Sequence, residues 1–240
     1  MSGTLTALKN APDGSLAVFQ ACAHNPSGVD PIDSQWDELF DMCERKNHTI
    51  AFDFAYMGYA SGDIDVDAEI VRRYAKLGRQ FFVAFSFSKC MGLYGERIGA
   101  CHAVCATPKE AAAVKSKLAS ALRASISVAP QNGALIAAEV LNTPELRSQW
   151  ISELKGVSSR VINIRNQLCD SLDSKTSISW EFLRNQRGMF ALTGLNPSQV
   201  DELAQKGVFI PQNGRISVPA LNTKNVDFVS QAIADVINSK

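Results

Sequence analysis

The sequence predicts an α/β fold with a mostly parallel sheet, followed by a smaller α+β domain. Between residues 15 and 105, short apolar runs alternate with amphipathic helical segments, a pattern typical of a parallel sheet with helices packed on it. Beyond residue 108 helical segments dominate, and the remaining strands are short. The change in pattern predicts two domains, over residues 1–157 and 158–240.

In the first domain, strands are predicted over residues 16–22, 49–53, 80–86 and 97–105. One helix begins at Asp33, where its apolar residues recur at i, i+3, i+4 and i+7 and form one core-facing stripe: Trp36, Leu39, Phe40 and Cys43. A second helix is predicted over residues 67–77. In the later part, helices are predicted over 108–123, 130–141, 144–172, 197–206 and 223–238, and strands over 180–183, 189–193 and 215–218.

Composition excludes several classes of protein. Hydrophobic residues make up 46% of the chain and charged residues 20%, which is ordinary for a globular protein and argues against disorder. The 24 basic residues equal the 24 acidic ones, so the chain has no net positive field to attract nucleic acid or an anionic membrane. No apolar run approaches the length of a membrane span. The 6 scattered cysteines are expected to be free thiols in a reducing compartment.

Polar groups follow three predicted strands in succession. Ligands of open parallel sheets bind beyond the carboxyl ends of the strands, so these groups are expected at one edge. They comprise an amide, a carboxylate, a phenol, two hydroxyls and an amine: Asn25, Asp53, Tyr56, Ser86, Ser88 and Lys89. A desolvated lysine is suited to Schiff-base chemistry, and a carboxylate can pair with a pyridinium nitrogen. The alternative is a structural salt bridge between Asp53 and Lys89, with a simple turn at Asn25-Pro26.

Several segments resemble the signature segments of the aspartate aminotransferases, class I pyridoxal-phosphate-dependent enzymes of fold type I. They lie at residues 21–28, 53–62, 86–89, 92–99, 188–190 and 214–217, in the family's order. The resemblance runs from about residue 9 to the C-terminus. It implies that the first domain is part of a cofactor-binding large domain and that the second is the small C-terminal domain.

The resemblance also implies roles for the cofactor-binding residues. Lys89 would hold pyridoxal 5'-phosphate as a Schiff base and then move a proton at the substrate's α-carbon. Asp53 would keep the pyridine nitrogen protonated. Tyr56 and Asn25 would bond the phenolic oxygen. The phosphate would be bound by Ser86, Ser88 and Arg97, because a guanidinium suits phosphate oxygens.

The implied substrates are L-aspartate and 2-oxoglutarate, or other dicarboxylic amino acids and 2-oxo acids. Arg215, with Asn25, would bind the α-carboxylate in a pocket lined by Phe190. Arg123 would reach across a homodimer to the distal carboxylate. The family usually has an aromatic residue and a Ser-Asn-Pro-Pro run after that arginine, whereas this chain has Ser-Val-Ala-Pro over 127–130.

The chain matches only the later part of the family, so it is expected to be N-terminally truncated. The strands that the family has earlier are absent, which predicts open sheet edges and exposed apolar faces. Two further departures are Gln20, where the family often has histidine, and Cys90, where it usually has asparagine.

Three functions remain open. The first is an aspartate aminotransferase of which this sequence is a fragment. The second is an inactive remnant that at most binds the cofactor or another protein, and the third is an aromatic or broad-specificity aminotransferase. No metal site is predicted, because the Asp63-x-Asp65-x-Asp67 run lacks the glycine and glutamate of a calcium loop. The expected location is cytoplasmic, with the mitochondrial matrix as the alternative.

Overall fold

The computed structural model describes residues 1–239, which form two compact units. Unit 1 contains Met1–Ala21, Pro31–Met57 and Ile64–Ser152, and unit 2 contains Cys22–Asp30, Gly58–Asp63 and the chain from Glu153 onward. The division falls inside the long helix α8 (Pro144–Lys175). The predicted domain boundary at 157/158 lies in the same helix and stays a prediction. None of the helices formed by these residues is long and apolar enough to cross a bilayer.

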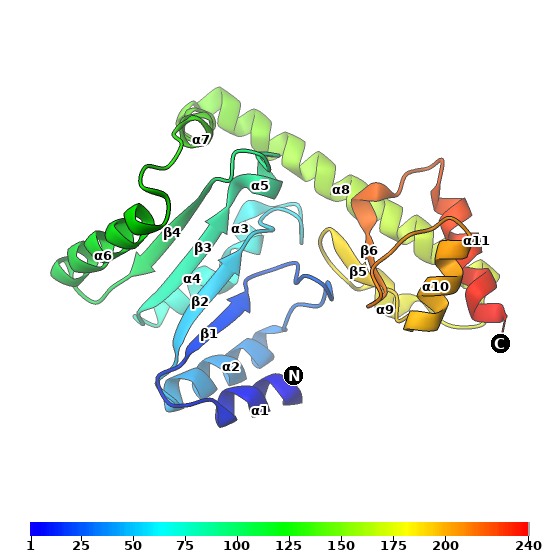
Figure 1. The fold of residues 1–240 in the computed structure, drawn as a ribbon, viewed down its shortest axis with the longest axis horizontal. Helices are drawn as coiled ribbons and strands as arrows, with labels where there is room; N and C mark the ends of the chain where they lie inside the picture. Colours follow the sequence, from blue (N-terminus) through cyan, green and yellow to red (C-terminus); the bar gives the residue numbers. More distant parts are fainter. Residues whose placement is uncertain (240) are drawn as a thin grey trace. The chain divides into compact units, whose positions relative to one another are not determined.

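Unit 1 is built on a four-stranded sheet, which confirms the predicted α/β class (Figure 1). Its strands lie in the order of the chain: β1 (Leu16–Gln20), β2 (Thr49–Phe54), β3 (Phe81–Ser86) and β4 (Gly99–Val104). The first three are parallel, and β4 runs antiparallel to β3. All four strands predicted for this region are therefore confirmed. Their parallel alignment brings the carboxyl ends of β1, β2 and β3 to one edge.

Two amphipathic helices cover one face of this sheet. The predicted stripe of α2 (Asp33–Arg45) is buried, and so are Ile70 and Tyr74 of α4 (Glu69–Lys76). Their aromatic rings pack on the sheet: the ring centroids of Phe40 and Tyr74 lie 6.4 and 5.8 Å from that of Phe52. The short helix α3 (Ile64–Asp67) precedes α4, and α1 (Ser2–Asn10), which the sequence pattern did not predict, lies along α2 (Figure 1).

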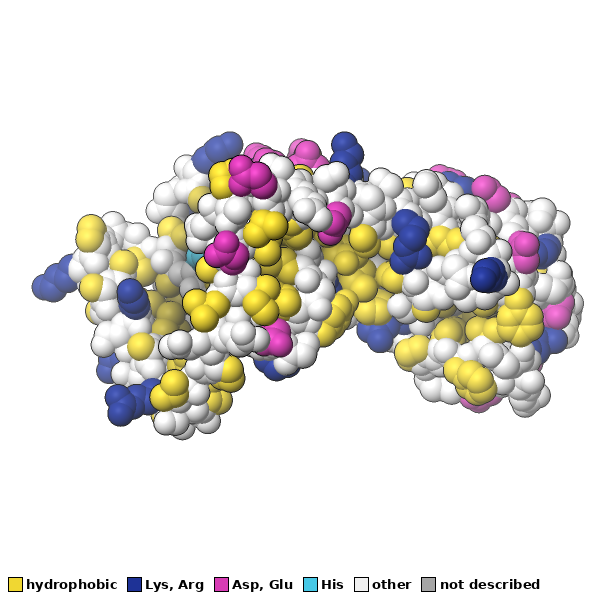
Figure 2. All heavy atoms as spheres, turned by 90° about the horizontal axis from the view of Figure 1, so that it is seen from above, with side chains coloured by type: hydrophobic (Ala, Val, Ile, Leu, Met, Phe, Trp, Pro, Cys, Tyr) yellow, Lys and Arg dark blue, Asp and Glu magenta, His cyan; other side chains and the backbone are white. Residues whose placement is uncertain are grey.

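The opposite face of the sheet is largely open. Side chains alternate across a strand, so the residues of β1 that point away from α2 are Leu16 and Val18, which are 60% and 64% exposed. On the same face Ala84 of β3 is also exposed. Hydrophobic side chains are visible on the molecular surface in Figure 2. A parallel sheet is ordinarily covered on both faces, so unit 1 carries apolar area that normally lies in a core.

This open face is expected to bind a hydrophobic dye such as anilinonaphthalene sulfonate. Replacing Leu16 and Val18 together by glutamine should lower the dye fluorescence, because it removes exposed apolar area. The free energy of unfolding should change by no more than about 0.5 kcal/mol, as for other surface sites. Ile32→Gln is the matched control, since Ile32 is 64% exposed but lies outside the sheet. Equal fluorescence from the double variant and the parent chain would contradict the assignment.

The remaining helices of unit 1 follow the predicted pattern. They are α6 (Pro108–Ile126), α7 (Asn132–Asn142) and the first turns of α8. The side chain of Thr107 accepts a hydrogen bond from the Glu110 amide and begins α6, with Pro108 in the first turn. An open, mostly apolar hollow lies between α6 and β4, lined by residues that include Ala103, Leu118 and Leu122.

Unit 2 has its own core beneath a two-stranded antiparallel sheet, β5 (Phe190–Leu192) and β6 (Arg215–Ser217). The later turns of α8 pack with α10 (Pro197–Gln205) and α11 (Val226–Asn238) around side chains with no exposed area: Leu168, Leu172, Leu183, Leu203 and Ile233. The turn η1 (Val218–Ala220) follows β6. These strands and helices confirm the predictions over 189–193, 215–218, 197–206 and 223–238.

The strand predicted over residues 180–183 is wrong. This segment forms the short helix α9 (Glu181–Arg184), whose turn is closed by the Leu183 amide donating to the Trp180 carbonyl oxygen at 2.9 Å. Asp173 accepts from the Trp180 amide at 2.9 Å and fixes where the turn begins. Trp180 and Leu183 are both fully buried, and their spacing of three residues suits one face of a helical turn rather than one face of a strand.

Candidate functional site

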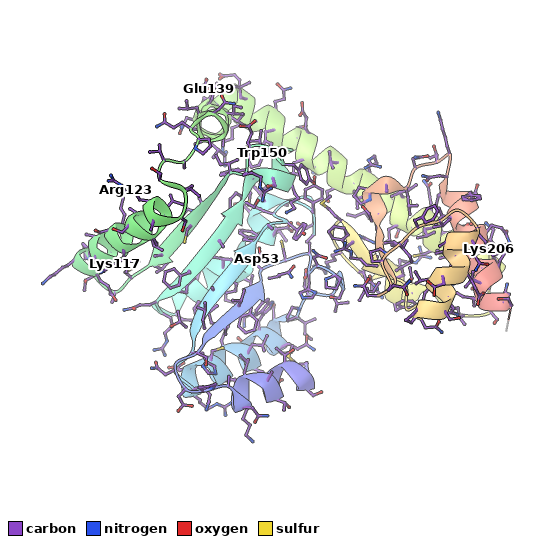
Figure 3. All side chains as sticks on the ribbon, viewed as in Figure 1. Asp53, Lys117, Arg123, Glu139, Trp150 and Lys206 are labelled. Carbon is purple, nitrogen blue, oxygen red and sulfur yellow. The ribbon has the colours of Figure 1, made fainter. Side chains whose placement is uncertain are left out.

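In unit 1, the ends of β2 and β3 bring together the predicted lysine and phenol. The Nζ of Lys89 lies 5.0 Å from the centroid of the Tyr56 ring, within the range of a cation–π contact. Asp53 lies near the end of β2 and is half-buried, with Ala84 of β3 beside it in register (Figure 3). An amine, a phenol and a carboxylate therefore occupy neighbouring strand ends, as the sequence predicted from the parallel sheet.

A four-residue helix, α5 (Phe87–Cys90), carries Lys89 directly after β3. Ser86 caps this helix, because its Oγ accepts a hydrogen bond from the Ser88 amide at 3.2 Å. At its other end, the indole nitrogen of Trp150 on α8 donates to the Cys90 carbonyl oxygen at 2.6 Å. Figure 3 labels Trp150 where α8 passes α5. The backbone on both sides of Lys89 is thus fixed by side-chain hydrogen bonds.

Two acidic groups that follow Lys89 in the chain, the Cys90 thiol and the Tyr94 phenol, have raised pKa values. Burial raises the pKa of the Cys90 thiol to about 11. Burial, and then the nearby Tyr56, raise the pKa of Tyr94. Because only the thiolate is strongly nucleophilic, the buried Cys90 thiol is a poor nucleophile at neutral pH.

The loop after α5 leads to β4 by a close approach to β3. A Cβ on Gly99 would lie 2.2 Å from the Phe85 carbonyl oxygen, so only glycine fits this position. Two residues earlier, Arg97 has a positive φ of 51° and an exposed side chain. Its guanidinium donates to the Tyr94 carbonyl oxygen at 3.0 Å. Ser88 is buried and Ser86 is half-buried, so the three residues predicted to bind phosphate differ in their exposure.

In unit 2, the structure brings together the three residues predicted to bind a carboxylate. The Nη1 of Arg215 on β6 donates to the Oδ1 of Asn25 at 2.8 Å. The guanidinium carbon of Arg215 lies 4.3 Å from the centroid of the Phe190 ring on β5. A guanidinium that lies over a ring presents its N–H groups at its edge, and those not bonded to Asn25 suit two-pronged binding of a carboxylate.

The loop that carries Asn25 is held by the carboxylate of Asp30. Its two oxygens accept from the amides of Ala23 and His24 at 2.8 and 2.9 Å. Gly28 has a φ of +66°, and a Cβ there would lie 2.8 Å from Cβ of Gln186 and 3.0 Å from the Phe190 carbonyl oxygen. The Arg187 amide donates to the Gly28 carbonyl oxygen at 2.6 Å. The 22–30 loop and the 186–190 segment are therefore packed in direct contact.

Arg123 stands apart from the other predicted residues of unit 1. It lies in the last turn of α6 with an exposed side chain, away from the strand end that carries Asp53 (Figure 3). The helix ends just after it, where Ser127 takes a φ of +61° and its amide donates to the Arg123 carbonyl oxygen at 2.8 Å.

Three residues that organise these sites were missed by sequence reasoning. Trp150 bonds a carbonyl 60 residues earlier in the chain, and Arg165 on α8 bonds one 23 residues later, at Gly188. No local pattern signals contacts across such separations. Asp30 contacts amides six and seven residues away, so its position after the Asn-Pro turn was the only signal available.

Comparison with known proteins agrees with this arrangement. The family model for class I and II aminotransferases matches residues 1–233. The chain belongs to this family. The cytoplasmic aspartate aminotransferase of Schizosaccharomyces pombe is 44% identical over 96% of this chain, and the mitochondrial enzyme of Gallus gallus is 41% identical over 98% of it. These matches span 57% and 56% of the relatives' own lengths, so the chain covers little more than half of them.

Solved structures show the same fold. An aspartate aminotransferase from Trypanosoma cruzi superposes with a TM-score of 0.94 at 39% identity, over 99% of this chain and 61% of that one. An aromatic-amino-acid aminotransferase from Burkholderia pseudomallei superposes with a TM-score of 0.94 at 40% identity, over 98% of this chain and 59% of that one. The latter is covalently bound to pyridoxal phosphate.

Pyridoxal phosphate is the cofactor of this family, and the donor groups of unit 1 fit its chemistry. The Lys89 amine can form a covalent bond to an aldehyde, and the half-buried Asp53 carboxylate can accept a hydrogen bond from a ring nitrogen. The Tyr56 phenol lies beside Lys89, where it can bond the ring oxygen.

Thiol labelling tests the environment of Lys89. With a pKa of about 11, Cys90 has about one thiolate per thousand molecules at pH 8, and burial also blocks access to reagents. Iodoacetamide at pH 8 should therefore label the exposed Cys101 first and leave Cys90 unmodified. Peptide mass spectrometry gives the order of labelling. In guanidinium chloride all 6 cysteines should react, and rapid labelling of Cys90 in the folded chain would contradict its burial.

Proposed function

We propose that this chain carries the cofactor-binding and substrate-binding groups of an aspartate aminotransferase, which transfers an amino group between L-aspartate and 2-oxoglutarate. The observation that supports the proposal best is the Lys89 amine beside the Tyr56 ring, with Asp53 on the neighbouring strand end. The chain is also 44% identical to a relative named aspartate aminotransferase.

In this proposal, Lys89 is both the attachment point of the cofactor and the base of the reaction. Pyridoxal phosphate supplies an aldehyde that condenses with amines and a ring that withdraws electrons from the bound amino acid. With the cofactor bound, Lys89 Nζ would serve as the base that removes a proton from the substrate's α-carbon and later returns it. The fixed backbone on both sides of Lys89 limits where its amine can reach.

Asp53, Tyr56 and Asn25 tune the cofactor in this proposal. The Asp53 carboxylate would accept a hydrogen bond from the ring nitrogen and so keep a proton on it, which would strengthen electron withdrawal. The phenol of Tyr56 would donate a hydrogen bond to the ring oxygen, a role that the proposal also assigns to the side-chain amide of Asn25. Ser86, Ser88 and Arg97 bind the phosphate, for which Arg97 would have to exchange its bond to the Tyr94 carbonyl oxygen.

Arg215 binds the α-carboxylate of the substrate in this proposal. Its stacking on Phe190 and its bond to Asn25 hold the guanidinium in one orientation before a ligand arrives, which reduces the entropy lost on binding. Arg123 is assigned to the distal carboxylate of a substrate held by the second copy in a homodimer. Its exposed position on α6, apart from Asp53, is compatible with such a role.

Reductive trapping tests the role of Lys89. The chain is incubated with pyridoxal phosphate, reduced with borohydride and digested, and the modified lysine is identified by mass spectrometry. We expect one label per chain, on Lys89, lost in Lys89→Ala and retained in Lys206→Ala, whose lysine is part of an exposed ion pair with Asp235. Label spread over surface lysines, or none, would favour the alternative that this chain is an inactive remnant.

A substrate panel separates the aspartate from the aromatic alternative. With aspartate and 2-oxoglutarate, Arg123→Met should raise the KM about tenfold or more, because the distal carboxylate loses a charge-assisted hydrogen bond. Turnover of phenylalanine should not change. Lys117→Met is the matched control, since Lys117 is exposed on the same helix. Faster turnover of phenylalanine than of aspartate by the unmodified chain would favour an aromatic or broad-specificity aminotransferase. Some structural neighbours carry these names.

A further inference from the structure

A buried arginine in unit 2 has no role in the chemistry described so far. Arg165, on α8, is only 2% exposed, and its guanidinium donates to the Gly188 carbonyl oxygen. Within residues 1–239 no carboxylate forms an ion pair with it, and its Nε has no hydrogen-bond partner. Burial lowers the pKa of this guanidinium, although arginine stays charged at neutral pH. Burying a cation without a counter-charge raises the free energy of the folded state. The one hydrogen bond that Arg165 makes among the described residues, to the Gly188 carbonyl oxygen, is therefore expected to have a role of its own.

The carbonyl that Arg165 binds belongs to a tightly confined segment. Gly188 has a φ of +84°, and a Cβ there would lie 2.5 Å from the Cβ of Ala23. The neighbouring Arg187 amide donates to the Gly28 carbonyl oxygen at 2.6 Å. The 186–190 segment is thus pressed against the 22–30 loop on one side and bonded by Arg165 from α8.

The same segment carries Phe190, which supports Arg215. Phe190 follows Gly188 by two residues, and its ring lies 4.3 Å from the guanidinium carbon of Arg215. Arg215 also donates to Asn25 on the loop that packs against Gly188. A displacement of Gly188 would therefore move both groups that orient Arg215.

We propose that Arg165 is a positioning residue for Arg215: by binding the Gly188 carbonyl oxygen, it fixes the 186–190 segment so that Phe190 and Asn25 hold the carboxylate-binding guanidinium in place. The inference rests on the proposed function only in assigning a carboxylate to Arg215. Its competitor is a purely structural role, in which Arg165 stabilises unit 2 without affecting the Phe190–Arg215 contact.

Nuclear magnetic resonance can distinguish these roles without any ligand. The Arg215 Nε–Hε signal is identified by its loss in Arg215→Lys. In the unmodified chain we expect it to be shifted by the ring current of Phe190, and Phe190→Leu should return it to the position of an unstacked arginine. Arg165→Gln should move it most of the way to that position, because glutamine is too short and uncharged to hold Gly188.

Two further variants complete the test. Arg160→Met is the matched control, since Arg160 also lies on α8 and donates to backbone carbonyls, those of Leu221 and Pro219. It should leave the Arg215 signal unchanged. Arg165→Lys keeps the charge but has a shorter reach and a single donor group, so it should give an intermediate position. If Arg165→Gln does not fold, the position of the Arg215 signal in Arg165→Lys serves as the test. A parental Arg215 signal in whichever of the two variants is folded would overturn the proposal.

Succinate binding, measured by calorimetry, separates this inference from the proposed function. We expect Arg165→Gln to weaken succinate binding about tenfold, and the double variant with Phe190→Leu to be no weaker than the weaker single variant, since both act through one contact. Unchanged succinate affinity in Arg165→Gln would overturn the positioning role. Failure of the unmodified chain to bind succinate, with the Arg215 signal still displaced in Arg165→Gln, would instead count against the carboxylate role and leave the positioning role supported.

Discussion

The parallel alignment of β1, β2 and β3 is the constraint on which the candidate cofactor site depends. Parallel pairing sends every connection back across the sheet, so the three carboxyl ends meet at one edge. Residues 36 positions apart, Asp53 and Lys89, then occupy neighbouring strand ends. Antiparallel pairing of β2 and β3 would have placed these two groups at opposite edges, and no side-chain change could have restored the arrangement.

The sequence alone predicted the secondary structure where a local pattern of apolar residues indicates which side chains are buried. Alternating or continuous apolar runs gave all four strands of the first sheet, and the i, i+3, i+4, i+7 stripe gave α2. The prediction failed at 180–183, because a short apolar run was interpreted as a strand although its two buried residues, Trp180 and Leu183, are three apart and so share a face only in a helical turn. The contacts of Trp150 and Arg165 could not be predicted, since each depends on where a long helix passes a distant carbonyl.

The two candidate sites are held by different physical means. Around Lys89, the backbone is fixed by discrete hydrogen bonds from Ser86 and Trp150. Around Arg215, shape dominates: glycines at 28 and 188 allow two backbone segments to touch where any side chain would clash. A hydrogen-bonded helix can rearrange by exchanging partners, whereas close-packed backbones can only separate. The open sheet face of unit 1, in contrast to the close packing around Arg215, carries apolar side chains that no described residue covers.

The bond from Trp150 to the Cys90 carbonyl oxygen gives the chain an internal optical reporter. Indole emission depends on the hydrogen bond made by its ring nitrogen, and this bond ends one residue from Lys89. The other two tryptophans, Trp36 and Trp180, are buried in the hydrophobic cores of the two units. A change at α5 that leaves both cores intact would therefore shift the emission maximum of Trp150 and not those of the other two tryptophans. Trp150 fluorescence would then record movement of the lysine-bearing helix α5 in real time.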